Sequence, residues 1–196
     1  MIVVVGSPIA RLDAGRLVAD GMPARVAIAA SDTGRPVQIV GRIGDDAAAD
    51  AVLQDLARAG VGHVAILRDP ARATPVARTG PEGEPAAEPA LDAAPEVDAA
   101  DIELALRYLT EFRVIVLNEP AARAVTDIVT RATEWGEAAL VIADPSPPGA
   151  GAPEAQIDVP ARAQVMRRGA DETESDFAAR VAALAVALDI GAVPAD

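Results

Sequence analysis

Few side chains in this sequence are of types that do chemistry, and they occur in small groups. Asp45 and Asp46 are adjacent and precede an Ala-rich stretch. Such paired carboxylates either bind a metal ion or, for at least one of them, cap the start of a helix. Arg167 and Arg168 lie near Arg162. This basic group either receives an anion or balances the acidic residues around it.

The composition excludes several kinds of catalytic site. All 17 basic residues are Arg, and the chain has no Lys and no Cys. This excludes Schiff-base chemistry, a P-loop lysine, a thiol nucleophile, disulfides and a thiolate metal site. His63 is the single histidine, so a zinc-hydrolase or Ser-His site would depend on it alone. Because it follows Gly62 at the start of an apolar run, its position favours a strand end or the surface.

The charge is strongly acidic and unevenly distributed. The formal net charge is −13 and the pI is about 4.4. Residues 1–80 carry 8 acids and 9 Arg, whereas residues 81–196 carry 22 acids and 8 Arg. Nucleic acids and anionic membranes are therefore not expected partners. The apolar run at residues 1–5 is too short for a signal or membrane segment, which predicts a cytoplasmic protein.

Short β-branched runs alternate with Ala-rich stretches of helical spacing, a pattern typical of a parallel sheet covered by helices. We expect strands at residues 2–5, 37–40, 64–67, 113–117, 139–143 and 164–167. We expect helices near residues 23–31, 46–59, 99–111, 120–134 and 172–189. Pro23 and Pro120 suit a first helical turn, while Gly60, Gly136 and Gly191 suit a left-handed residue at a helix end.

These elements predict one domain over residues 1–196, a three-layer α/β fold with a mostly parallel sheet and helices on both faces. An acidic, Pro-rich connector is expected at residues 81–98, becoming helical near Asp98. Residues 144–160 hold five Pro and two Gly and are expected to form a long loop. Weak strand signals at residues 16–19 and 76–79 are all that indicates a second, smaller sheet.

Several motifs, in their order along the chain, resemble the ribokinase-like, or PfkB, family of sugar and nucleoside kinases. The segment DGMPARVA at residues 20–27 looks like the family's Gly-Gly-x-x-x-Asn-x-Ala helix. The segment VQIVGRIGDD at residues 37–46 is similar to the family's strand and Gly-Asp-Asp turn, and is the most specific match. Weaker echoes are LNEP at residues 117–120 and DETE at residues 171–174. The resemblance implies a ribokinase-like fold with a reduced lid.

The resemblance also identifies candidate ligand-binding residues. Arg11 stands where the family has a sugar-binding Asp, and Arg25 where it has a sugar-binding Asn. Asn118 and Glu119 match the stretch with an acid that contacts substrate, although Glu119 also suits a helix start. Because Arg donates hydrogen bonds and cannot accept them, Arg11 and Arg25 would select an anionic ligand such as a sugar phosphate or carboxylate.

The family's nucleotide site and Gly-Ala-Gly-Asp motif would follow Asp196, where the sequence ends. The expectation is therefore a PfkB-related protein without phosphotransfer of its own, with no catalytic residue, metal or cofactor, acting as a binding or assembly module. One alternative is a sugar or nucleoside kinase completed by a second chain. Another is a sensor of an anionic sugar derivative.

Two further expectations concern the last helix and the partners. Asp171 and Glu174 either retain the family's metal- and phosphate-linked acid or form a helix cap with Asp171 as the N-cap residue. Phe177, Val181, Leu184 and Leu188 form one apolar stripe. We expect a homodimer or a second subunit, with the interface on the lid or on the terminal helix with Phe177.

Overall fold

The computed structural model describes residues 1–79, 85–87, 94–118, 120–146 and 163–192. A six-stranded sheet lies at its centre, and all neighbouring strands are parallel. In spatial order the strands are β10 (Ala163–Arg167), β9 (Ala139–Asp144), β8 (Val114–Asn118), β1 (Ile2–Val5), β4 (Val37–Gly44) and β5 (Gly62–Asp69). All six had been predicted, with shorter bounds for most.

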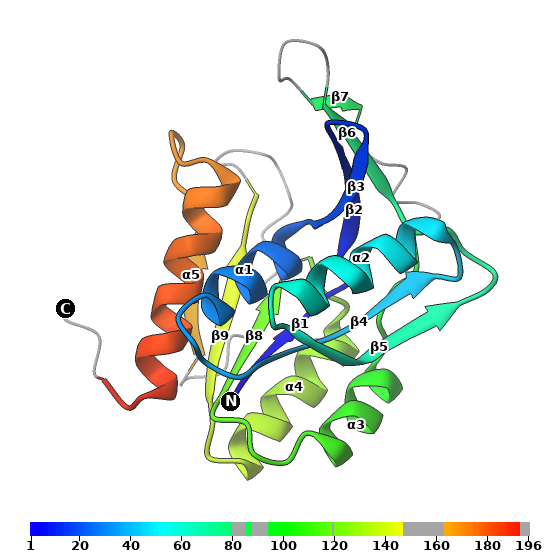
Figure 1. The fold of residues 1–196 in the computed structure, drawn as a ribbon. Coiled ribbons are helices and arrows are strands. Elements are labelled where there is room, and N and C mark those ends of the chain that lie inside the picture. The colour runs from blue at the N-terminus through cyan, green and yellow to red at the C-terminus, as the bar shows by residue number, and fades with distance from the viewer. Residues whose placement is uncertain (80–84, 88–93, 119, 147–162, 193–196) are drawn as a thin grey trace.

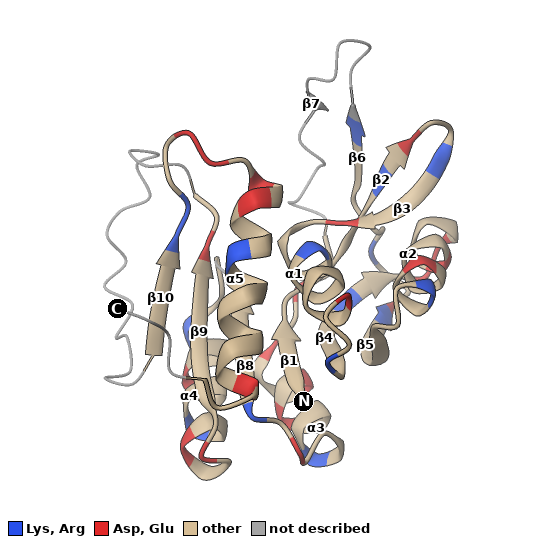
Figure 2. Cartoon of the chain, turned by 60° about the vertical axis from the view of Figure 1, so that its left-hand side comes forward, with Lys and Arg blue, Asp and Glu red and all other residues tan. Residues whose placement is uncertain are grey.

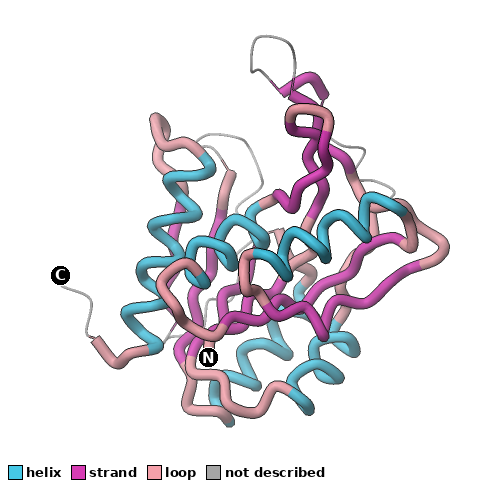
Figure 3. The backbone as a smooth tube through the Cα atoms, viewed as in Figure 1, coloured by secondary structure: helices cyan, strands magenta, loops and turns pink. Residues whose placement is uncertain are grey.

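Helices cover both faces of this sheet, which confirms the three-layer α/β prediction (Figures 1 and 3). On one face lie α1 (Met22–Ser31), α2 (Ala47–Arg58) and α5 (Glu174–Asp189). On the other lie α3 (Ala99–Tyr108) and α4 (Arg123–Trp135). The central strand β1 is apolar at every position because Ile2 and Val4 face the first helix layer while Val3 and Val5 face the second.

A second sheet projects from the carboxyl side of the main sheet as a lid (Figure 1). Its strands, in the order β3-β2-β6-β7, are β3 (Arg16–Asp20), β2 (Ile9–Asp13), β6 (Val76–Thr79) and β7 (Pro85–Ala87). The β2–β3 hairpin turns on Ala14 and Gly15, both at positive φ (46° and 82°), as a two-residue hairpin loop requires. The sequence indicated β3 and β6 but not β2 and β7.

Both ends of α4 differ from the prediction. Pro120 does not open α4, which starts at Arg123, because Ala122 is extended (φ −63°, ψ 142°) and acts as the N-cap. Gly136 has φ −82°, so it is not left-handed; Glu137 takes that conformation with φ 50°. The left-handed predictions for Gly60 and Gly191 are confirmed, as is Pro23 in the first turn of α1.

The start of α5 also corrects the sequence analysis. Thr173, not Asp171, is the N-cap: its Oγ1 accepts a hydrogen bond from the Asp176 backbone N–H at 3.1 Å. Phe177 is fully buried in the core, so this side chain is not available for an interface, and an interface on the lid or on another side of α5 stays a prediction. The lid has an exposed apolar residue in Leu12, which is 40% exposed.

The segment expected to be a connector is only partly described, and β7 lies within it. Its end is confirmed: Asp98 caps α3 in a capping box with Asp101. Arg42 of β4 fixes this helix to the sheet by donating to both Asp101 carboxylate oxygens, at 2.6 and 2.8 Å. Of the loop expected at residues 144–160, residues 147–160 lie outside the described part. None of the described helices combines the length and apolarity needed to cross a membrane.

Candidate functional site

The order in which the chain adds strands to the main sheet reverses beside β1. The chain passes from β1 to β4 and β5 on one side, then returns to β8 on the other, so β1 and β8 flank a switch point. Ligands of open α/β sheets bind outside the carboxyl ends of strands at such points. The backbone here is closely packed, because a Cβ at Gly6 would lie 2.7 Å from Pro23 Cγ and one at Gly41 would lie 2.5 Å from the Gly6 carbonyl oxygen.

Asn118, at the carboxyl end of β8, presents an unsatisfied acceptor at this switch point. Its Nδ2 donates to the Val5 carbonyl at 3.1 Å, which fixes the amide, and the residue is only 7% exposed. Within the described residues nothing donates to its Oδ1. An unpaired buried acceptor is costly, so a donor from a ligand hydroxyl or a water would be favoured there. Glu119, the other candidate from this stretch, lies outside the described residues.

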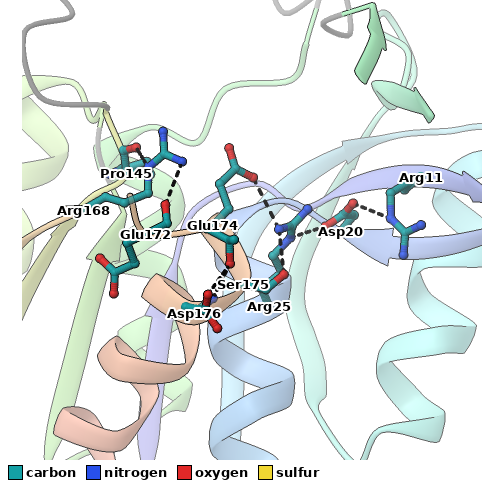
Figure 4. Close-up of polar contacts among 10 residues, drawn as sticks. Arg11, Asp20, Arg25, Pro145, Arg168, Glu172, Glu174, Ser175 and Asp176 are labelled. Carbon is teal, nitrogen blue, oxygen red and sulfur yellow. Dashed lines mark hydrogen bonds and ion pairs between the residues drawn. The ribbon is translucent and has the colours of Figure 1, made fainter. Parts of the chain in front are cut away.

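Arg11 and Arg25 meet at one carboxylate, that of Asp20 (Figure 4). Asp20 ends β3 of the lid, Arg11 lies on β2, and Arg25 lies in the first turn of α1. Arg25 Nε donates to Asp20 Oδ1 at 2.5 Å, and Arg11 Nε lies 2.8 Å from Asp20 Oδ2. We call Arg11, Asp20, Arg25, Glu174 and Ser175 the Asp20 cluster.

Asp20 is held ionised in spite of its burial. It is 4% exposed, and burial alone would raise its pKa. The hydrogen bond and charge of Arg25, the Gly21 backbone N–H and the charge of Arg11 outweigh burial, so the pKa of Asp20 is lowered. Burial acts to lower the pKa of Arg25, but its pairing with Asp20 and Glu174 raises it.

The cluster extends to the start of α5, which makes it a junction of lid, α1 and α5. Arg25 Nη1 donates to Ser175 Oγ at 3.2 Å and lies 3.4 Å from Glu174 Oε2 (Figure 4). The two Arg are matched by the carboxylates of Asp20 and Glu174, so the cluster is formally neutral. Figure 2 shows acidic residues around this end of α5. The structure thus brings Arg11 and Arg25 together at Asp20. Asn118 lies near the start of the same helix, because a Cβ built on Gly6 would lie 2.7 Å from Pro23 of α1 and 3.4 Å from Asn118.

Sequence reasoning missed Asp20 and Ser175 as members of this cluster. In the segment DGMPARVA, Asp20 stands at the position of the resembled motif's first Gly, which gives it no role of its own. The available signal was the spacing of Asp20 and Arg25 across a helix start, which brings a carboxylate within reach of a guanidinium. No sequence signal pointed to Ser175, because its contact with Arg25 joins residues 150 positions apart.

The other charged groups singled out in the sequence serve as structural contacts. Asp46 caps α2 by accepting from Ala49 N–H at 2.8 Å and also accepts from Thr74 N–H at 2.7 Å, which confirms the capping alternative. Asp45 pairs with Arg68 at 3.1 Å. In the part of the chain that the structure describes, no three His, Asp or Glu side chains gather as a metal site would need.

Arg167 and Arg168 both contact the end of β9 and the residue after it. Arg167 Nε lies 3.9 Å from Asp144 Oδ2, and Arg168 donates to the Pro145 carbonyl at 2.8 Å. Arg162 is outside the described residues. Next to them, Glu172 accepts from the Gly169 N–H at 3.0 Å and from Arg180 Nε and Nη2 at 2.8 and 2.7 Å. These contacts hold the loop before α5 against the first turns of that helix.

Glu172 gives this end of α5 a pH dependence that can be measured. The Arg180 hydrogen bond and the Gly169 N–H lower the pKa of Glu172 from 4.5 to about 2. A carboxylate with a lowered folded-state pKa stabilises the fold above its unfolded pKa, and this stabilisation is lost as the pH falls from 4.5 through about 2. We therefore expect Glu172→Gln to melt below the wild type at pH 6 and at nearly the same temperature at pH 2.

Melting curves followed by circular dichroism between pH 2 and 6 test this. Glu103→Gln, which removes the exposed helix-surface pair with Arg107, is the matched control and should change the melting temperature less at pH 6. A constant gap between Glu172→Gln and wild type across the whole range would contradict the assignment.

Comparisons with known proteins identify the fold. No family model and no curated protein matches the sequence. Among solved structures, fructokinase from Xylella fastidiosa is 20% identical with a TM-score of 0.62, over 75% of this chain and 53% of that one. A carbohydrate kinase from Agrobacterium tumefaciens is 15% identical with a TM-score of 0.61, over 72% and 52%. An uncharacterized sugar kinase from Pyrococcus horikoshii is 17% identical with a TM-score of 0.55, over 72% and 52%.

The fold is therefore the ribokinase-like fold of PfkB-type sugar kinases, as the motifs indicated. The chain spans about half the length of these solved structures.

Proposed function

We propose that this chain is a sugar-kinase-related binding module that does not transfer phosphate by itself. The observation that carries the proposal is the Asp20 cluster. The two positions where the resembled kinases contact sugar, here Arg11 and Arg25, are engaged in ion pairs within the protein. The remaining acceptor between them, Asp20, already receives a guanidinium on each oxygen.

Hydrogen-bond chemistry explains why this arrangement does not suit a neutral sugar. A sugar hydroxyl is held well by a carboxylate or amide oxygen that accepts its proton, whereas a guanidinium only donates. The Asp20 oxygens would have to release Arg11 or Arg25 to accept a hydroxyl. Release would leave a buried carboxylate without its partner charge, at a cost of several kcal/mol by order of magnitude.

The cluster also does not supply the free positive charge that phosphoryl transfer uses. Catalysts of this reaction stabilise charge on the transferred group with Lys, Arg or metal ions. The chain has no Lys, and the charges of Arg11 and Arg25 are compensated by Asp20 and Glu174. The lid sheet and the switch point between β1 and β8 are present, and these support binding without catalysis.

A second candidate function, the sensing of a small hydroxylated ligand with an anionic group, is favoured by Asn118. Its buried Oδ1 has no donor among the described residues and would accept a hydrogen bond from one hydroxyl that reached it. The side chains of Arg11 and Arg25 are 35% and 28% exposed, so part of each is accessible to an anion from solvent. A sugar phosphate combines these two chemistries, although Glu174 opposes its charge.

Phosphotransfer is tested by incubating the purified chain with ATP, Mg²⁺ and a panel of hexoses, pentoses and nucleosides. We expect no sugar phosphate and no ADP above the protein-free rate, because the chain has no Lys and the charges of Arg11 and Arg25 are compensated by carboxylates. Magnesium-dependent product that disappears in Arg25→Ala would contradict the proposal.

Calorimetry with ribose, ribose 5-phosphate and ATP separates the two candidates. Saturable binding of ribose 5-phosphate that is lost in Asn118→Ala, but kept in the matched buried-polar variant Thr133→Ala, would favour the sensor. Equal binding in both variants would exclude Asn118 as a ligand contact.

A further inference from the structure

A groove separates the edge strand β5 from helix α3, on the face of the sheet away from α1, α2 and α5. Its volume is about 370 Å³. Seven of its eight lining residues have largely apolar side chains: Val64, Ala65 and Leu67 from β5, and Leu104, Ala105, Tyr108 and Leu109 from α3 or just after it. The eighth, Asp101, is paired with Arg42. The groove lies apart from the Asp20 cluster.

The groove exists because, among the described residues, the layer of α3 and α4 has no helix that covers β5. On the first face α2 packs against β5, and Ile66 and Leu56 belong to the same core. On the second face α3 packs against β4, and α4 packs against β8 and β9 (Figure 1). No described helix lies over β5 on this second face. A helix packs about 8–10 Å from its neighbour, so a helix added beside α3 at that spacing would lie over β5.

The rim of the groove exposes large side chains that folding alone leaves in water. Val64 is 80% exposed, Tyr108 is 79% exposed and Leu104 is 46% exposed. Tyr108 is one of only four aromatic residues in the chain. Leu104 and Tyr108 are four residues apart, so they lie on the same face of α3. Exposed apolar side chains that line one groove and include a Tyr are typical of a protein-binding site.

The charges along the groove are predominantly acidic. Residues 96–111 contain five acids and one Arg, and Arg42 adds one more positive charge through its pair with Asp101. Exposed acids flank both ends of α3, with Glu96 and Asp98 before it and Glu111 after it. A second copy of this chain, with its own net charge of −13, is a poor match for this face. A basic occupant is a good one.

We propose that the groove between β5 and α3 binds an amphipathic helix of a partner protein, with apolar residues at i, i+3, i+4 and i+7 and Arg or Lys on its flanks. The helix would complete the layer of α3 and α4, cover Val64, Leu104 and Tyr108, and place its basic flanks near Glu96 and Glu111. This is the helix-in-groove mode of recognition. It goes beyond the proposed function and uses a different surface.

The test uses three synthetic peptides of about 14 residues, four helical turns. One has a Leu stripe with Lys flanks, one has the same stripe with Glu flanks, and one scrambles the first. Fluorescence anisotropy with the intact chain measures binding. We expect the Lys-flanked peptide to bind at least about tenfold tighter than the other two, with an affinity that falls as salt rises.

Variants locate the binding surface. Leu104→Arg should weaken binding of the Lys-flanked peptide about tenfold or more, because it places a cation on the apolar rim that the peptide's Leu stripe would cover. Val165→Arg, on the opposite edge strand β10 and 37% exposed, is the matched control and should bind like the wild type. The surface double variant Glu96→Lys, Glu111→Lys should reverse the preference toward the Glu-flanked peptide. It changes only exposed side chains, so it remains informative if Leu104→Arg fails to fold.

Three outcomes would overturn the inference. The first is equal binding of the Lys-flanked and scrambled peptides, and the second is equal binding by the Leu104→Arg and Val165→Arg variants. The third is a wild-type dimer in sedimentation that Leu104→Arg converts to monomer, since the occupant would then be a second copy. None of these results bears on phosphotransfer, so the proposed function stands or falls separately.

Discussion

Replacing Asp20 by Ala is expected to lower the free energy of unfolding by about 3 kcal/mol. Asp20 is 4% exposed and is the shared close partner of Arg11 and Arg25. Its loss leaves each guanidinium only a longer ion pair to an exposed carboxylate, at 3.6 Å for Arg11 and 3.4 Å for Arg25. Breaking a buried ion pair by removing one member costs about 3–5 kcal/mol, and the lower end applies because both Arg side chains reach solvent. Urea denaturation followed by circular dichroism measures the change.

Asp13→Ala is the matched control, because Asp13 lies on the same lid strand as Arg11 and pairs with it. That pair is long, at 3.6 Å, and the Asp13 side chain is 59% exposed. A surface pair of this kind contributes about 0–1 kcal/mol, so the variant should unfold close to the wild type. If Asp20→Ala and Asp13→Ala were equally stable, the junction at Asp20 would be no stronger than a surface contact.

The main sheet was predictable because its strands are apolar on both faces. Runs such as residues 2–5 and 139–143 are recognisable without knowing their neighbours, since both faces are buried against helices. The lid strands β2 and β7 were not recognised. β2 alternates weakly and ends in charged and exposed residues, and β7 has three residues beginning with Pro85. Their existence depends on pairing with β3 and β6, which a local pattern does not record.

The candidate site was predictable in position but not in its contacts. Arg11 and Arg25 were identified because they replace residues of a resembled motif, and the structure brings them together. Their common partner Asp20 follows from the hairpin register, which places Ile9 opposite Asp20 and so sets Arg11 two residues along the same strand. Whether a guanidinium faces a ligand or a carboxylate is decided by this tertiary register. The orientation of the Asn118 amide is likewise decided by tertiary structure. Its Nδ2 donates to the carbonyl of Val5 on the neighbouring strand, and this leaves Oδ1 without a donor among the described residues.

The helix caps show the same limit on a smaller scale. Asp171 and Thr173 both suit an N-cap by residue type, and each has an acidic residue three positions later. The structure uses Thr173, because Glu172 between them is engaged by Arg180 and Gly169 and holds the preceding loop in place. Residue type alone therefore allows α5 to start after Asp171 or after Thr173. The contacts of Glu172 with Gly169 and Arg180 favour the start after Thr173.

Phe177→Ala is expected to lower the free energy of unfolding by about 4 kcal/mol. Phe177 is fully buried and is the largest of the fully buried side chains in the described residues. It lies in the core shared by α5, α1 and the sheet. Truncation loses the transfer free energy of the ring and leaves a cavity that the rigid surroundings fill only in part. It also removes the ring beneath the Arg180 guanidinium, 5.1 Å from the ring centroid. Urea denaturation measures the loss.

Trp135→Ala is the control that separates burial from side-chain size. Trp135 is larger than Phe177 and also lies in a helix, but it is 85% exposed at the end of α4. Its side chain buries little apolar surface against the rest of the protein, so we expect the free energy of unfolding to change by less than about 0.5 kcal/mol. The ordering is what matters, because the smaller aromatic residue should give the larger loss. If Trp135→Ala destabilised the chain as much as Phe177→Ala, the side of α4 that carries Trp135 would have to be packed against something, and the core would not be the one described around α5.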